Sequence, residues 1–186
     1  GPPLTRDRTR DALVLGLADG NELRYHDAKD MGKLYLTDDP DQVPTFAELG
    51  PEATDPNLTL EVFRERLRRY HGEIKGVLTN QKFVAGIGNV YKSEVLFLER
   101  LAPQVWLGDL DDDRLLRLYQ RARRLLGGNL RGGPRVTRRA NDDAGRLWVY
   151  GRTGRPCLVC DDRIHSARLG HGLRSTFWCP ACQPFS

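Results

Sequence analysis

The chain has 186 residues, of which 39% are hydrophobic and 29% charged, with four cysteines and a net charge of +4. This composition is typical of a globular protein and excludes collagen-like and disordered chains. It also excludes a membrane protein, because no apolar run approaches the roughly 20 residues that span a bilayer. The polar N-terminus does not have the pattern of a signal peptide.

The charge is unevenly distributed along the chain. Residues 1–60 hold 6 Lys and Arg against 12 Asp and Glu, a net −6, whereas residues 61–186 hold 23 against 13, a net +10. A basic block favours a polyanionic partner, above all nucleic acid. A solvated basic surface would give the same count, so charge alone leaves both interpretations open.

Residues 12–36 predict short strands. Leucines alternate with smaller residues from Leu13 onward, and Asp19 with Gly20 supplies a hairpin turn. A further short strand is expected at residues 33–36. Because three short strands cannot bury both faces of a sheet, we expect these residues to be the end of a larger β domain whose beginning is missing from this chain.

Residues 37–57, rich in Asp, Pro and Glu, predict a linker. Thr59 is a plausible N-cap for the helix that follows. That helix is expected to bury Val62, Phe63, Leu67 and Tyr70. Further helices are expected near residues 74–81, over 90–100 and after the aspartates at 111–113, which favour a helix N-terminus.

A glycine-bent turn, Gly86-Ile-Gly88-Asn89, lies between two of the expected helices. Its glycines let the backbone turn sharply, and Asn89 then begins a helix whose free N–H groups can hold a DNA phosphate. It is not a dinucleotide-binding loop, because Tyr91 replaces the third glycine. Taken alone, the turn could also be an ordinary connection between helices.

The last thirty residues contain two CxxC pairs, Cys157 with Cys160 and Cys179 with Cys182, with 18 residues between the pairs. This spacing matches a zinc ribbon, in which two tight turns close a tetrahedron of thiolates around the ion. Two disulfides in a secreted protein are the alternative. His165 or His171 could replace a cysteine, but four thiolates already complete the site. We expect one structural zinc ion, without which the module does not fold.

The stretch 74–103 resembles the helix–two-turn–helix of the formamidopyrimidine-DNA glycosylase and endonuclease VIII family. The tail, from Val149 through Cys157 and Arg174 to Gln183, resembles the C-terminal zinc finger of that family. The two motifs occur in the family's order, and with residues 25–36 the resemblance covers most of the chain.

The resemblance implies an α+β fold in three parts. Residues 1–44 would be the end of an N-terminal β-sandwich, present only as short strands. Residues 45–146 would form the helix–two-turn–helix DNA-binding domain, with a flexible loop at 127–146. Residues 147–186 would form the four-cysteine zinc-finger β-hairpin.

The resemblance also implies roles for five residues. Asn89 and Arg174 match the residues that grip the phosphates beside a damaged nucleotide, and Lys75 matches a basic residue of the DNA-facing helix. Lys29 and Met31 match an arginine and a phenylalanine that fill the gap left by a flipped base. An ordinary surface or core position is the alternative for each of them.

In the family the chain begins with a proline followed by glutamate, and the proline attacks the damaged nucleoside. Here the chain opens Gly1-Pro2-Pro3, so we expect no nucleophile in it and assign no catalytic residue. The expected function is therefore that of the damaged-DNA-binding, zinc-containing portion of a base-excision-repair glycosylase. Such an enzyme flips out and removes oxidised bases and also has abasic-site lyase activity. We expect this chain alone to be inactive.

Two other functions fit the same residues. One is a naturally non-catalytic reader of damaged DNA, and the other is a structural zinc-ribbon protein that binds nucleic acid. The repair-glycosylase interpretation, which we prefer, implies that the partner is double-stranded DNA with a damaged or abasic site. It also implies that the protein does not bind a membrane and is a monomer. It also implies a location in the bacterial cytoplasm, at the nucleoid.

Overall fold

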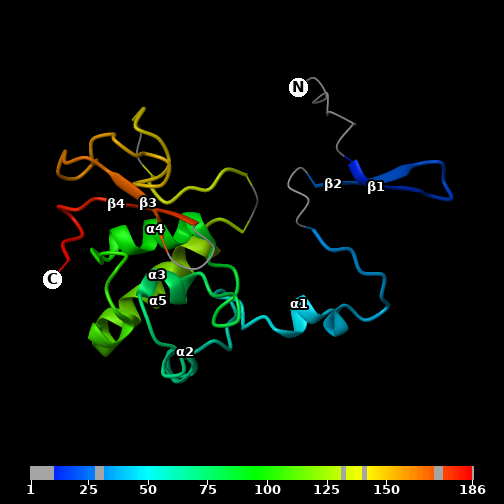
Figure 1. Ribbon diagram of the computed structural model, residues 1–186, viewed down its shortest axis with the longest axis horizontal. Helices are drawn as coiled ribbons and strands as arrows, with labels where there is room; N and C mark the ends of the chain where they lie inside the picture. The colour runs from blue at the N-terminus through cyan, green and yellow to red at the C-terminus, as the bar shows by residue number, and fades with distance from the viewer. Residues whose placement is uncertain (1–10, 28–31, 131–132, 140–141, 170–173, 186) are drawn as a thin grey trace. The chain divides into compact units, whose positions relative to one another are not determined.

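The computed structural model describes residues 11–27, 32–130, 133–139, 142–169 and 174–185 (Figure 1). The chain divides into two compact units, one ending at Ala47 and the other beginning at Glu48. The helices from α2 onward and the cysteine module both belong to the second unit. The three-part division expected from the sequence, with boundaries after residues 44 and 146, stays a prediction.

The first unit contains the expected hairpin. Strand β1 (Asp11–Gly16) pairs antiparallel with β2 (Glu22–His26), and Leu15 lies opposite Leu23. The turn closes as the sequence predicts, since Gly20 has a φ of +83°, a conformation that favours glycine. Two short helical segments follow later in the unit, η2 (Pro40–Gln42) and α1 (Pro44–Ala47).

The strand expected at residues 33–36 is wrong. These residues have no regular structure, and Leu34 and Leu36 are exposed. Within the described part of the chain, the sheet of this unit consists of β1 and β2 alone, so no neighbouring strand satisfies the backbone groups of residues 33–36. A β-like composition predicts a strand only where a partner strand is available.

The second unit is built on helices whose order follows the sequence prediction. They are α2 (Leu60–Leu67), α3 (Ile74–Leu78), α4 (Asn89–Leu98), η3 (Leu107–Asp109) and α5 (Asp112–Gly127). The Thr59 hydroxyl accepts a hydrogen bond from the Val62 N–H at 3.3 Å, which confirms the predicted N-cap. The Asp111 carboxylate caps α5 in the same way, accepting from the Arg114 N–H at 2.7 Å.

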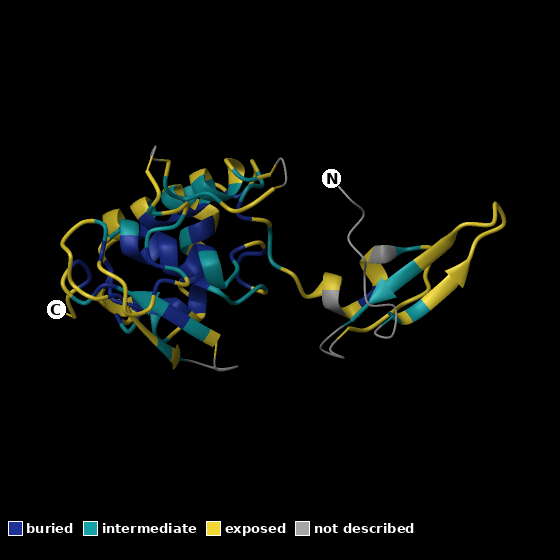
Figure 2. Ribbon diagram, turned by 90° about the horizontal axis from the view of Figure 1, so that it is seen from above, coloured by how far each residue is buried: buried dark blue, intermediate teal, exposed yellow. Residues whose placement is uncertain are grey.

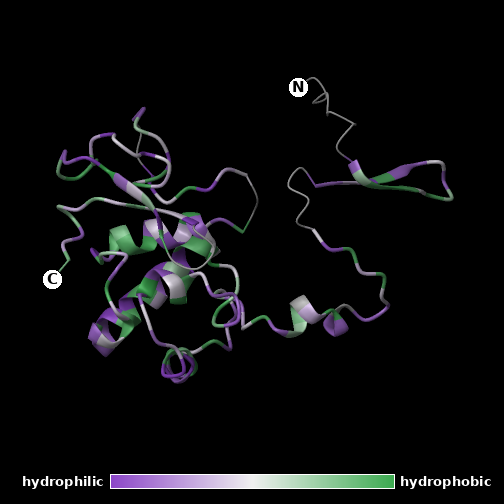
Figure 3. Ribbon diagram, in the orientation of Figure 1, coloured by the Kyte–Doolittle hydropathy of each residue, from purple (hydrophilic) through white to green (hydrophobic). Residues whose placement is uncertain are grey.

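The helices enclose one apolar core (Figure 2). The Phe63 ring lies 4.6 Å from the Tyr119 ring and 5.2 Å from the Phe83 ring, centroid to centroid, so α2, α5 and the segment before α4 meet there. Hydrophobic and hydrophilic residues alternate along α5, as an amphipathic helix on a core requires (Figure 3). Val62, expected inside, is exposed because it lies away from the face of α2 that buries Phe63.

The expected linker at 37–57 is only partly a linker. Its second half packs on the helical core, where Ala53 is buried, and Leu58, directly after the segment, is buried as well. A bridge between Glu52 and Ala85 ties this segment to the turn before α4. Composition could not show this, because the pairing depends on a segment more than thirty residues away.

The cysteine module contains a second hairpin, β3 (His165–Leu169) paired antiparallel with β4 (Arg174–Trp178). It does not have a core of its own making. Its buried cluster combines Val149, Ile164 and three of the cysteines with Phe97 from α4. Helix α4 therefore packs against the cysteine module on one side and contributes to the helical core on the other.

The loop at 127–146 is held by hydrogen bonds where the structure describes it. The Asn129 amide donates to the carbonyls of Leu125 and Val136 at 2.7 and 3.0 Å, and Thr137 and Arg138 both donate their N–H groups to the Arg146 carbonyl at 3.0 Å.

In the part of the chain that is described, no helix combines the length and apolar character needed to cross a bilayer.

Candidate nucleic-acid interface and metal centre

The glycine-bent turn places Asn89 as the first residue of α4. Gly86 has a φ of +95°, which confirms the predicted sharp turn, whereas Gly88 is extended and serves as the N-cap. The side chain of Gln81 fixes this turn. It donates to the Ile87 carbonyl at 3.0 Å and accepts from the Gly86 N–H at 3.0 Å. The free N–H groups of α4 are thus held in a defined direction.

The structure brings Asn89 and the neighbourhood of Arg174 together. The Asn89 amide nitrogen donates to the carbonyl of Ser175 at 2.5 Å, and Ser175 follows Arg174 on β4. The Asn89 Oδ1 is buried without a hydrogen-bond partner among the described residues. The start of α4 and the start of β4 therefore form one corner, although the two bonded residues lie 86 positions apart in the sequence.

Lys75 lies on α3, where its side chain is buried and pairs with Glu73. Lys75 and Arg174 line the same open groove, of about 850 Å³, which runs between α3 and the β3–β4 hairpin. His71 and the exposed Trp106 complete its rim. Of the five residues that the sequence assigned to DNA, Lys75 and Arg174 thus line one groove, and Asn89 is hydrogen-bonded to the residue that follows Arg174. Whether they contact DNA stays a prediction.

Lys29 and Met31, the other two predicted DNA contacts, lie outside the described residues.

Lys92 belongs to the same corner but was not singled out by the sequence. Its side chain is only 2% exposed, and its Nζ donates to the buried hydroxyl of Thr176 at 2.8 Å. Burial lowers the pKa of Lys92 to about 8, and the positive charges of Arg174 and Lys75 contribute to the same shift. Three cations from α3, α4 and β4 therefore act on one another at this corner.

Glu94 fixes the cysteine module to α4. Its fully buried carboxylate accepts hydrogen bonds from the backbone N–H groups of Trp148, Val149 and Tyr150 at 2.8–2.9 Å, and from the hydroxyl of Thr137. Such a set of donors stabilises a buried carboxylate. The segment that enters the module is therefore held to one side of the helix, and this sets where β4 can lie.

Gln183 ties down the other end of the module. Its buried side chain donates to the Leu101 carbonyl at 2.7 Å and accepts from the Cys179 N–H at 3.0 Å.

The sequence contained one signal for Lys92, Glu94 and their neighbours. They interrupt a helix that is otherwise apolar on every face, and polar residues in such a helix indicate a polar contact inside the protein.

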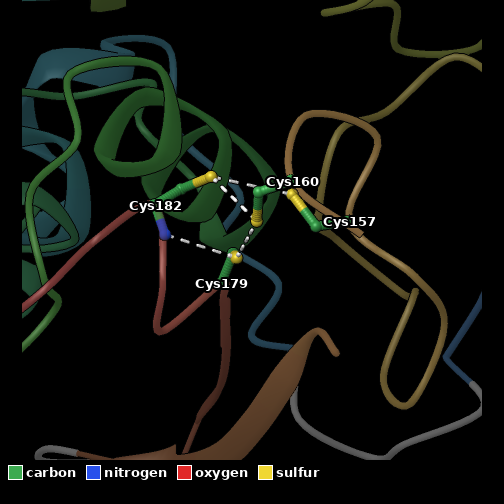
Figure 4. A group of neighbouring side chains, drawn as sticks. All are labelled: Cys157, Cys160, Cys179 and Cys182. Atoms are coloured by element: carbon green, nitrogen blue, oxygen red, sulfur yellow. Dashed lines mark hydrogen bonds between the residues drawn. The ribbon is translucent and has the colours of Figure 1, made fainter. Parts of the chain in front are cut away.

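The four cysteines converge on one point (Figure 4). Their Sγ atoms all lie within 4.8 Å of one another. The individual separations are 3.8 Å for Cys157–Cys182, 3.4 Å for Cys160–Cys179 and 3.4 Å for Cys160–Cys182. The four thiols are free in this structure, since an S–S bond is about 2.05 Å long. A tetrahedron of thiolates at ~2.3 Å from a central ion has edges of ~3.8 Å, so these four side chains could hold one metal ion.

Burial acts against the thiolate form of the inner cysteines. Burial raises the pKa of Cys179 to about 11 and also raises the pKa of Cys182, whereas a backbone hydrogen bond from Asp162 lowers the pKa of Cys160. A bound cation would offset the cost of gathering several thiolates in a buried place. His165 is exposed and packs edge-on against Trp178 rather than pointing to the cysteines, and His171 lies outside the described residues.

Comparison with known proteins agrees with this arrangement. Residues 49–139 match the family model described as the formamidopyrimidine-DNA glycosylase H2TH domain. The formamidopyrimidine-DNA glycosylase of Pelotomaculum thermopropionicum is 33% identical over 180 residues, which cover 92% of this chain and 64% of the relative. The corresponding protein of Chloroflexus aggregans is also 33% identical, over 97% of this chain and 68% of the relative.

Two solved structures resemble the fold closely. The MutM (Fpg) protein of Thermus thermophilus has a TM-score of 0.79 and 28% identity, covering 97% of this chain and 71% of that one. The Fpg of Lactococcus lactis, solved in complex with DNA containing an abasic site, has a TM-score of 0.79 and 30% identity, covering 98% of this chain and 69% of that one.

The fold and the site define a helix–two-turn–helix protein with a four-cysteine hairpin docked on its central helix. The chain belongs to the formamidopyrimidine-DNA glycosylase family. It spans 64% of the length of the Pelotomaculum relative and 68% of that of the Chloroflexus relative.

Proposed function

We propose that this chain binds double-stranded DNA at a damaged or abasic nucleotide. We further propose that the protein acts in base-excision repair as a glycosylase that removes oxidised bases and cleaves abasic sites. In this proposal Asn89, Arg174 and Lys75 hold the sugar–phosphate backbone around the lesion. Lys29 and Met31 are assigned, on the resemblance alone, to the space left by the flipped base. DNA as the partner would place the protein at the bacterial nucleoid.

One observation carries the proposal. The hydrogen bond from Asn89 to Ser175 joins the N-terminus of α4 to the strand that begins with Arg174. A helix N-terminus offers unsatisfied N–H groups, and a guanidinium offers a fork of donors, so the two together suit a phosphate group. Phosphate contacts fix the register of a protein on a duplex without reading its sequence, as a lesion-binding protein requires.

The surroundings of this corner support a polyanionic ligand. Lys75 and Arg174 line one groove, and residues 61–186 carry a net charge of +10. Attraction of this kind raises the rate and strength of DNA association at low salt. The relatives point the same way, since the Lactococcus lactis protein was solved with DNA that contains an abasic site.

We assign a structural role to zinc in the four-cysteine centre. Cys157, Cys160, Cys179 and Cys182 match the ion in donor type, number and spacing, and four thiolates leave no open position for catalysis. The ion would hold the turn after β4 against the loop that carries Cys157. The β3–β4 hairpin would then stay in the position that presents Arg174.

Fluorescence anisotropy with short labelled duplexes tests the proposal. We expect the zinc-loaded chain to bind a duplex containing a tetrahydrofuran abasic analogue more tightly than an undamaged duplex or an RNA duplex of the same sequence. Preference for the RNA duplex would instead support a structural zinc-ribbon protein. Equal binding to damaged and undamaged DNA would contradict recognition of the lesion.

A further inference from the structure

Lys92 is a buried cation that the proposed phosphate clamp does not yet explain. It lies in the first half of α4, its side chain is 2% exposed, and its Nζ donates at 2.8 Å to the hydroxyl of Thr176, which is itself fully buried. Among the described residues, no carboxylate lies within ion-pair distance of this Nζ. Burial of an ammonium group without a counter-charge is costly, so the position needs an explanation.

The charged groups that face Lys92 are themselves mostly positive. From α3 comes Lys75, which is paired with Glu73, and from β4 comes Arg174. Helix α5 also packs against α4, but the charged pair there, Arg121 with Glu99, lies two turns further along the helix. Among the described groups around Lys92, the charges of Lys75 and Arg174 thus act against it, and the carboxylate of Glu73 is paired with Lys75.

This arrangement becomes favourable when an anion arrives. A backbone phosphate held by Asn89 and Arg174 would bring negative charge next to the group formed by Lys75, Lys92 and Arg174, and the repulsion among the cations would be offset. A lysine whose only role was structural would be stabilised in the free protein by a carboxylate, or replaced by an apolar side chain of similar length.

We propose that Lys92 is a positioning residue for DNA, whose buried ammonium supplies the third positive charge of a phosphate site formed with Lys75 and Arg174. It acts through Thr176, because its hydrogen bond holds β4 against α4 and so holds Arg174 over the N-terminus of the helix. This inference rests on the proposed function and deepens it, because it names a residue through which DNA binding is coupled to the uptake of a proton.

The coupling has a definite sign. In the free chain burial and the neighbouring cations lower the pKa of Lys92 to about 8. A phosphate at the site raises this pKa, so in the window above about pH 8 the complex holds more protons than the free chain. Up to one proton per chain then moves from the solvent to the Lys92 Nζ when DNA binds, and the uptake grows as the pH rises above about 8. Affinity therefore falls as pH rises through that window, and is independent of this group at lower pH.

Binding measurements across pH test the inference. The dissociation constant of the zinc-loaded chain for an abasic-analogue duplex is measured at fixed ionic strength from about pH 6.5 to about pH 9.5, for the wild type, Lys92→Met, Lys92→Arg and Lys82→Met. Lys82 is a matched control, since it is an exposed lysine paired with Glu48. Thermal melts confirm that each variant is folded.

For the wild type we expect a dissociation constant that is flat near neutral pH and rises at least about fivefold toward pH 9.5. Lys92→Met should bind at least about fivefold more weakly at pH 7 and lose the alkaline rise, whereas Lys92→Arg should keep neutral affinity and also lose the rise. Lys82→Met should follow the wild type. Calorimetry at about pH 8.5 in two buffers of different ionisation enthalpy should show proton uptake by the wild type and none by Lys92→Met.

Two results would overturn the inference. A wild-type affinity that stays flat across the whole range, without proton uptake, excludes the coupling even if Lys92→Met fails to fold. A folded Lys92→Met that binds as tightly as the wild type and keeps its alkaline rise assigns the titration to another group. In both cases DNA binding by the wild type leaves the proposed function standing. Failure of the folded wild type to bind DNA at any pH overturns the proposed function, and this inference with it.

Discussion

Asn89 and Arg174 are the residues on which the proposed interface depends most directly. We expect Asn89→Ala and Arg174→Ala each to weaken binding to an abasic-analogue duplex by about 1–3 kcal/mol, because in the proposed interface each supplies a hydrogen bond to a charged phosphate. Fluorescence anisotropy gives the affinities, and thermal melts check the fold. Arg163→Ala is the control, since this exposed arginine in the same module donates to the Gly154 carbonyl. Wild-type affinity in either test variant would contradict the clamp.

The double variant adds information about the geometry. Asn89 contacts Ser175, so its loss also loosens the strand that presents Arg174. Two residues that share one ligand and one support are not independent, so their effects should not add. The double variant should therefore lose less affinity than the sum of the two single losses.

Glu94 is a residue whose contribution concerns stability rather than binding. Glu94→Gln replaces an oxygen that accepts backbone hydrogen bonds with an amide that donates, so buried N–H groups lose their partner. We expect the free energy of unfolding to fall by about 2–3 kcal/mol, measured by urea denaturation. Glu65→Gln, which removes an exposed pair with Arg68, should cost less than about 1 kcal/mol. Equal losses in the two variants would contradict the role given to Glu94.

At the scale of elements, local signals in the sequence were sufficient where one short stretch decides the structure. Thr59 caps α2, Gly20 closes the first hairpin and Gly86 bends the turn before α4, because each conformation depends on a few neighbouring residues. The spacing of the cysteines predicted their convergence, because each CxxC turn is a local structure and two such turns together offer the four ligands that one ion could take.

Sequence patterns failed where the outcome depends on distant partners. Residues 33–36 have the composition of a strand but no strand beside them in the described structure, and Ala53 is buried because its segment pairs with the turn at Ala85. Lys92 and Thr176 meet across 84 residues, and neither has a motif of its own. Their contact follows from how the cysteine module docks on α4, which is decided by tertiary packing.

The N-cap of α5 provides a test at this scale. Asp111→Ala removes the acceptor for the Arg114 N–H, so we expect the free energy of unfolding to fall by about 1 kcal/mol. Circular dichroism during urea denaturation measures the change. Asp113→Ala, in the first turn of the same helix but without the capping bond, should have an effect of only a few tenths of a kcal/mol. DNA affinity should be unchanged in both, since α5 does not line the groove of Lys75 and Arg174.

For the whole molecule, the two buried clusters predict two levels of stability. One cluster is built from the helices and contains no cysteine, whereas the other joins Phe97 of α4 to Val149, Ile164 and three of the cysteines. We therefore expect the helical core to form without the proposed metal but not the module, because its apolar contacts are few and an ion would be needed to hold its four thiolates together. The proposed metal would thus control one half of the proposed interface and leave the other half, at Asn89, in place.

Removal of the metal separates these two halves. After treatment with a strong zinc chelator, or in Cys157→Ser, we expect loss of one bound zinc per chain by metal analysis and loss of the near-ultraviolet signal of Trp148 and Trp178, with most helical signal retained. DNA affinity should fall by more than in Arg174→Ala, because the whole hairpin loses its position. Zinc added back should restore the chelated chain but not the Cys157→Ser variant. A metal-free chain that keeps the hairpin and binds DNA normally would show that packing on α4, rather than the ion, holds Arg174 in place.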